Sequence, residues 1–177
     1  MKNINKLTFC AIIAALAVVF MLLSYFPYLT YAIPALSGLF IMVTVIEINA
    51  KWATLAYVTA AAVLIISPAD IESKALFICF FGFYPILKAL IERLRKPFFE
   101  WPLKILIFNI ALALIYIAFT KLTSVSLDDF GVLGEYGAVV LLGLGNITFI
   151  VYDIAVSRVA MFYMFKLHNK IKKLLGN

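Results

Sequence analysis

Polar and aromatic side chains recur at helical spacing within three strongly apolar stretches in the second half of the chain. The first stripe consists of Lys74, Phe77, Phe81, Tyr84 and Lys88. The second consists of Asn109, Ala113, Tyr116 and Thr120, and the third of Gly143, Asn146, Ile150, Asp153 and Ser157. Intervals of three and four residues place each stripe on one helix face. Because polar groups in apolar helices usually face the bundle interior, we expect the three stripes to face one another.

Ligand binding is the chemistry that these side chains favour. Aromatic walls with sparse polar groups suit a flat, partly apolar ring. The predicted site consists of Phe77, Phe81, Tyr84 and Tyr116 as walls, Lys74 at the mouth, Asn146 at the floor, and Tyr28 and Tyr31 as a cover. Lys74 suits a carboxylate or phosphate, and an interfacial lysine that extends to the membrane surface is an equal alternative. For Asn146, ligand binding and helix packing are equally supported.

The sequence shows no set of residues with the types and spacing that catalysis or metal binding requires. It contains no cluster of Cys, His or carboxylates at metal-ligand spacing, no Gly-rich phosphate loop after a strand, and no Ser/His/Asp set within its apolar stretches. We therefore expect no metal, no cofactor and no enzymatic activity. Lys88 and Asp153 lie at similar expected depth, which favours a structural ion pair between their helices over a transport role. Asn109 is expected to join helices through hydrogen bonds.

The segments that must position these side chains are long and apolar. Hydrophobic residues make up 66% of the chain and the mean hydropathy is +1.09, more apolar surface than a soluble domain of 177 residues can bury. A helix needs roughly 20 apolar residues to cross the hydrocarbon of a bilayer. We predict an all-α integral membrane protein, one domain over residues 1–177, with six transmembrane helices at about 8–26, 33–49, 52–67, 75–92, 102–120 and 136–165.

The distribution of basic residues predicts the orientation of these helices. With a cytoplasmic N-terminus, the outer side keeps only Lys74 and Lys121 of the 15 Lys and Arg residues. Basic residues concentrate on the cytoplasmic side of membrane proteins, so both termini are expected inside. The net charge of +6 then reflects topology and attraction to anionic lipid in the bilayer, and it gives no reason to expect nucleic acid as a partner.

The first helix carries two small residues, Ala11 and Ala15, four positions apart on one face. This spacing permits close helix contact. Together with six helices, a short first outer loop and polar positions on the last three helices, it resembles the substrate-binding S component of energy-coupling-factor transporters of the bacterial cytoplasmic membrane. The resemblance covers essentially the whole chain and is architectural.

The resemblance implies a function and partners. Ala11 and Ala15 would dock on a transmembrane coupling subunit that is joined to two cytoplasmic ATPases. The S component would capture a water-soluble vitamin or related micronutrient from outside, and the first outer loop, about Pro27 to Ile33, would be its lid. The helix-six sequence "LGLGNITFIVYD" matches no vitamin-specific signature, which leaves the substrate open.

Two other classes of membrane protein are alternatives. One is a small scaffold of a membrane complex, like the rod-shape-determining proteins. The other is a secondary permease, which would normally show an acidic relay deep in the membrane or an inverted repeat. The two halves of the chain differ in polarity and show no such repeat.

Overall fold

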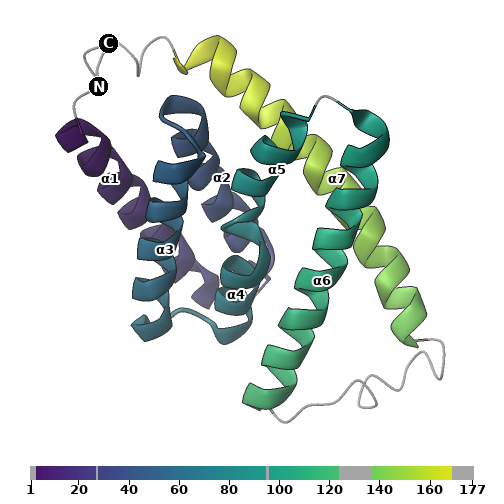
Figure 1. The fold of residues 1–177 in the computed structure, drawn as a ribbon. Helices are drawn as coiled ribbons and strands as arrows, with labels where there is room; N and C mark the ends of the chain where they lie inside the picture. Colours follow the sequence, from purple (N-terminus) through teal and green to yellow (C-terminus); the bar gives the residue numbers. More distant parts are fainter. Residues whose placement is uncertain (1–2, 27, 95, 124–136, 169–177) are drawn as a thin grey trace.

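The protein is helical throughout the residues that the structure describes. Figure 1 shows the computed structural model, which describes residues 3–26, 28–94, 96–123 and 137–168. Within these ranges there is no strand. The elements are α1 (Asn3–Leu22), the 3-10 turn η1 (Leu23–Tyr25), α2 (Ala32–Glu47), α3 (Ala50–Ile66), α4 (Ile71–Leu76), the π-helical segment η2 (Phe77–Phe81), α5 (Tyr84–Glu92), α6 (Pro97–Thr123) and α7 (Gly137–Lys166).

Several of these helices suit a membrane. Four stretches of the described residues are long and apolar enough to span one, namely Asn3–Tyr25, Ile71–Glu92, Phe98–Ile115 and Leu142–Lys166. The helices α2 and α3 are apolar but shorter, at 16 and 17 residues. The prediction of an all-α fold is therefore confirmed, and the long apolar helices are compatible with a membrane protein. That all six segments cross the bilayer stays a prediction.

Successive helices run in alternating directions (Figure 1). The start of α1, the α2–α3 connection, the α5–α6 connection and the end of α7 all lie at one end of the molecule. The elements α4, η2 and α5 together make one passage along the bundle. An up-and-down arrangement of this kind brings the start of α1 and the end of α7 to the same end of the molecule, as the predicted topology requires. Its orientation across a membrane stays a prediction.

Side-chain caps define the helix starts at the connections before α3 and α4. The Oδ1 atom of Asn49 accepts from the Trp52 backbone N–H at 3.1 Å, and the Oδ2 atom of Asp70 accepts from the Ser73 N–H at 2.9 Å. These bonds satisfy donors that a helix start otherwise leaves unpaired. The Ser73 hydroxyl also donates to the Thr30 carbonyl at 2.8 Å, which ties the first loop to α4.

Helices α1, α2 and α3 pack tightly around small residues. Ala17 of α1 and Ala53, Ala56 and Ala60 of α3 are completely or almost completely buried. Small side chains let helix backbones approach closely, which is how apolar helices gain packing energy when lipid is as apolar as the partner helix. This group of helices forms the first core cluster, and Phe77 of η2 is buried in it.

The π-helical segment η2 interrupts the passage between α4 and α5. Its wider turn leaves the Ile78 carbonyl to accept from the Tyr57 hydroxyl of α3 at 2.6 Å. Gly38 of α2 lies so close that a Cβ atom there would come within 2.3 Å of the Phe81 carbonyl oxygen. The sequence predicted a regular helical stripe here, and the wider turn changes it: Phe77 and Phe80 are buried, in different clusters, while Phe81 is half-buried.

Candidate functional site

An aromatic cluster lies where η2 and α5 meet α6 and α7. Its members are Phe80, Phe81, Tyr84, Phe108, Phe149 and Tyr152. Phe108 of α6 and Phe149 of α7 stack in parallel, with ring centroids 4.7 Å apart and an interplanar angle of 10°. Phe80 contacts both rings edge-on. These contacts join three passages of the chain through aromatic faces and edges.

A buried charged network adjoins this cluster. Asp153 of α7 forms an ion pair with Lys88 of α5 through Oδ1 and with Lys104 of α6 through Oδ2, the second at 3.2 Å. Its Oδ1 atom also accepts from the Tyr84 hydroxyl at 2.5 Å. Glu92 pairs with both lysines at 2.8 Å. The ion pair that the sequence predicted between Lys88 and Asp153 is therefore present in the structure, as part of a larger network.

The network is closed and electrically balanced. Lys88, Lys104 and Asp153 are between 3% and 5% exposed, so each charge requires a partner. Two ammonium groups face two carboxylates. Glu92 reaches the surface, with 43% of its side chain exposed, at the end of α5. This arrangement locks α5, α6 and α7 together near the α5–α6 connection.

A pair of asparagines lies on the other side of the aromatic cluster. Asn109 of α6 and Asn146 of α7 exchange two hydrogen bonds, at 3.0 Å and 3.2 Å. Along α7, Asn146, Phe149 and Asp153 follow one another at intervals of three and four residues, on one face. The site between α6 and α7 therefore has three layers in order: an amide pair, an aromatic cluster and a charged network.

The structure brings together some of the predicted site residues and separates others. Phe81 and Tyr84 belong to the aromatic cluster, and Asn146 borders it. Phe77 is instead buried against α1 to α3. The Lys74 ammonium group donates to the Ser67 carbonyl at 2.5 Å, and Lys74 is not a member of the aromatic cluster. The side chain of Tyr116 lies outside what the structure describes.

The two tyrosines predicted to cover the site are exposed. Tyr28 is 99% exposed and has a left-handed backbone with φ of 74°, and Tyr31 is 67% exposed. Partial burial of its hydroxyl, together with the carboxylates of Glu72 and Asp70, raises the pKa of Tyr31, so that the phenol stays neutral. Both side chains lie on the connection before α2, free to contact a ligand or partner.

Six members of the site were not predicted as such: Phe80, Glu92, Lys104, Phe108, Phe149 and Tyr152. Lys104 was counted only as a topology signal near the cytoplasmic side. On α7 the buried residues are Phe149, Asp153, Val156 and Tyr163. The predicted stripe therefore contained Asn146 and Asp153 correctly but had Ile150 in place of Phe149. A periodicity that gave large aromatic residues priority over aliphatic ones would have found Phe149.

Metal chemistry has no carrier in the described part of the chain, where no group of three His, Cys, Asp or Glu side chains comes together. Cys10 and Cys79 are free thiols. No family model, no curated protein and no solved structure matches this chain significantly.

Proposed function

We propose that the chain is the substrate-binding S component of an energy-coupling-factor type transporter. It spans the membrane six times with both termini in the cytoplasm. It captures a water-soluble micronutrient that contains a ring, and a separate transmembrane coupling subunit with two cytoplasmic ATPases supplies the energy for uptake. Two features support this topology: successive helices run in alternating directions, and the start of α1 lies at the same end of the molecule as the end of α7.

The surface of α1 is the observation that carries the proposal. The helix buries Cys10, Ile13, Ala14, Ala17 and Met21 against the bundle. Ala11 and Ala15 lie on its exposed side, beside the bulky and exposed Ile12 and Leu16. Two small residues between larger ones form a shallow strip that another helix can approach closely. The proposed occupant of this strip is the coupling subunit.

The ligand site that we propose lies between α6 and α7. In Figure 1 these helices cross near α5, and their ends away from that crossing diverge. The proposed site centres on the Asn109–Asn146 pair and on the stacked rings of Phe108 and Phe149 next to it. A flat ligand that separates the amide pair gains both amides as hydrogen-bond partners and aromatic faces as walls.

Copurification with coupling partners tests the docking surface. Ala11→Trp and Ala15→Trp should each abolish association with the coupling subunit and leave ligand binding by the isolated chain intact. Val58→Trp is the matched control, because Val58 of α3 is equally apolar and 53% exposed. Association that survives both alanine substitutions would reject the docking role of α1.

A ligand screen tests the binding site independently. Purified protein is heated with a panel of vitamins and their precursors, and the proposed function predicts a stabilising hit without ATP. Asn146→Ala should weaken that hit at least tenfold, whereas Thr148→Ala, on the exposed side of α7, should not change it. A hit that is indifferent to Asn146→Ala would place the pocket elsewhere.

A membrane scaffold is the second candidate. The closed charged network favours it, because every ionised group there already has a partner within the chain. A scaffold would give no hit in the ligand screen. It would copurify with a membrane complex that contains no ATPase.

A further inference from the structure

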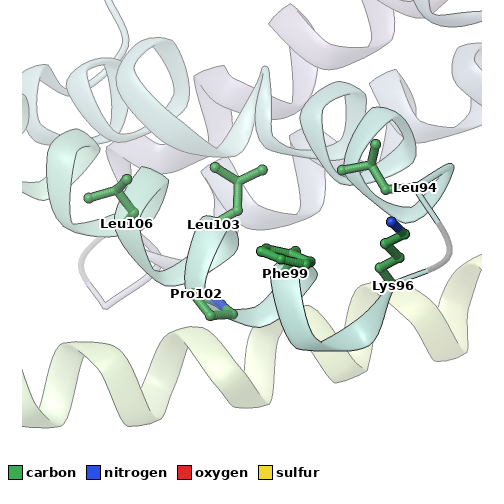
Figure 2. Close-up of a pocket in the computed structure, with 6 residues that line it drawn as sticks. All are labelled: Leu94, Lys96, Phe99, Pro102, Leu103 and Leu106. Carbon is green, nitrogen blue, oxygen red and sulfur yellow. The ribbon is translucent and has the colours of Figure 1, made fainter.

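An open groove of about 540 Å³ lies at the α5–α6 connection. It is lined by Leu94, Lys96, Phe99, Pro102, Leu103 and Leu106. Figure 2 shows Lys96 at one end of the groove and Leu106 at the other, with Phe99 between them. Five of the six lining residues are apolar, and the ammonium group of Lys96 is the single charge on the wall.

The groove is amphipathic along its length. Lys96 immediately precedes α6, and its carbonyl accepts from the Phe99 and Glu100 N–H groups. Leu106 follows ten residues later, about 15 Å along the helix. A molecule that fills the groove therefore meets a cation at one end and only apolar side chains further along.

The charges around Lys96 favour an anion. Arg93 and Lys96 are exposed, and neither forms an ion pair with a described residue. Lys88 and Lys104, in contrast, each form ion pairs with both Asp153 and Glu92. The start of α6 adds the positive end of a helix dipole. Glu100, which is half-buried in the first turn, opposes it, and the two exposed cations outnumber this one carboxylate.

Aromatic residues next to the groove suit a membrane interface. Phe98 and Phe99 are 82% and 59% exposed, and Trp101 is 39% exposed. Exposed aromatic side chains beside basic ones are typical of the level of the lipid headgroups. The groove thus descends from the headgroup region toward the hydrocarbon.

We infer that the groove binds an anionic glycerophospholipid of the cytoplasmic leaflet. Its phosphate lies at Lys96, and one acyl chain lies along Leu103 and Leu106. This site needs the predicted orientation of the helices in the membrane. It is independent of the transport function, because it uses no residue of the amide pair, the aromatic cluster or the α1 surface.

The chain contains its own reporter for such a lipid. Of its two tryptophans, Trp101 lies between the lining residues Phe99 and Pro102, and Trp52 lies on α3. A Trp52→Phe background therefore isolates the fluorescence of Trp101. The protein is reconstituted in phosphatidylcholine vesicles that contain either brominated phosphatidylglycerol or brominated phosphatidylcholine. Quenching at increasing fractions of brominated lipid gives the relative affinity of the site for the two headgroups.

We expect phosphatidylglycerol to bind about fivefold more tightly, the effect of one lysine near an anionic lipid. Lys96→Gln should remove this preference, and Lys96→Arg, which keeps the positive charge, should retain it. Lys51→Gln, an exposed lysine on α3, is the matched control and should retain it too. Millimolar inorganic phosphate should not reduce quenching by the lipid. Equal quenching by the two lipids, an undiminished preference in Lys96→Gln, or competition by free phosphate would overturn the inference. None of these outcomes bears on the ligand screen or on copurification.

Discussion

Helices α1 to α3 and the segment from α4 to α7 are held together by different interactions. The first group buries alanines and aliphatic side chains, and its helices approach closely. The second buries Lys88, Lys104 and Asp153 beneath an aromatic cluster. Dispersion between packed side chains cannot be switched by a solute, whereas hydrogen bonds and ion pairs can exchange partners. The first group therefore depends mainly on dispersion, whereas the second also depends on hydrogen bonds and ion pairs, and it is in the second that our proposal places the ligand.

Two polar contacts with Glu47 join the end of α7 to the first group. The Glu47 carboxylate, at the end of α2, accepts from the Tyr163 hydroxyl at 2.6 Å and lies 3.0 Å from the Nδ1 atom of His168. The side chain of His168 is 26% exposed. These bonds anchor the end of α7 to α2.

The largest predicted effect comes from removing the anion at the centre of the charged network. Asp153→Asn keeps the shape of the side chain but leaves two buried ammonium groups with the single carboxylate of Glu92. We expect a loss of about 3–5 kcal/mol in the free energy of unfolding. The protein in detergent is titrated with a denaturing detergent, and the loss of helical signal measures its unfolding.

A double substitution separates charge from shape in this prediction. In Lys88→Met/Asp153→Asn, the remaining pair of Lys104 and Glu92 is neutral again. This variant should be more stable than Asp153→Asn alone. If Asp153→Asn were as stable as the unmodified protein, the network would be too hydrated to hold α5, α6 and α7 together.

The next effect concerns the close contact between the two regions. Gly38→Ala puts a Cβ atom within 2.3 Å of the Phe81 carbonyl oxygen, which is backbone and cannot rotate away. We expect α2 and η2 to be forced apart at a cost of about 1–3 kcal/mol. Gly143→Ala is the control, because a Cβ atom there meets nothing within 4 Å. The two variants are compared by thermal unfolding, and equal midpoints would contradict the contact.

The sequence was sufficient to predict the helices but not their rotation. Long apolar segments identify the elements, because a helix in a membrane must satisfy its own backbone. The pairing of Lys88 with Asp153 also followed from the cost of an unpaired charge between apolar helices. The separation of Phe77 from Phe81 did not follow, because a π-helical turn depends on its neighbours: Tyr57 takes up the released carbonyl and Gly38 leaves room.

Lys104 shows the same limit for the site. A lysine two positions after Pro102, at a helix start that is predicted to be cytoplasmic, is well explained by the predicted topology alone. That it turns inward to Asp153 is set by how far α6 and α7 overlap, which residue spacing within one helix does not encode. The predicted stripes therefore identified the right helices and some of the residues, such as Tyr84 and Asp153, but missed others, such as Lys104 and Phe149.

A smaller effect is expected at the π-helical turn. Tyr57→Phe keeps the ring contacts with Phe77 and Phe83 but removes the hydroxyl that donates to the Ile78 carbonyl. The loss should be about 1 kcal/mol. Backbone amides in Phe77–Phe81 should exchange hydrogen faster. Tyr25→Phe, which alters a tyrosine that is 79% exposed, should change neither quantity, and unchanged exchange in Tyr57→Phe would contradict the role of the hydroxyl.

The smallest effect is expected at the amide pair, and it decides whether this layer is structural or holds a ligand. Asn109→Ala and Asn146→Ala each remove both mutual hydrogen bonds. Because partners are also found in the unfolded state within a membrane or detergent, the coupling between the two positions should be only about 0.6 kcal/mol in a double-mutant cycle. A weak pair of this kind can be separated by a ligand that replaces its hydrogen bonds, whereas a coupling of about 2 kcal/mol or more would mark the pair as a structural bond that helps to close α6 against α7. The cycle is measured on ligand-free protein, so its outcome is fixed before any substrate is known.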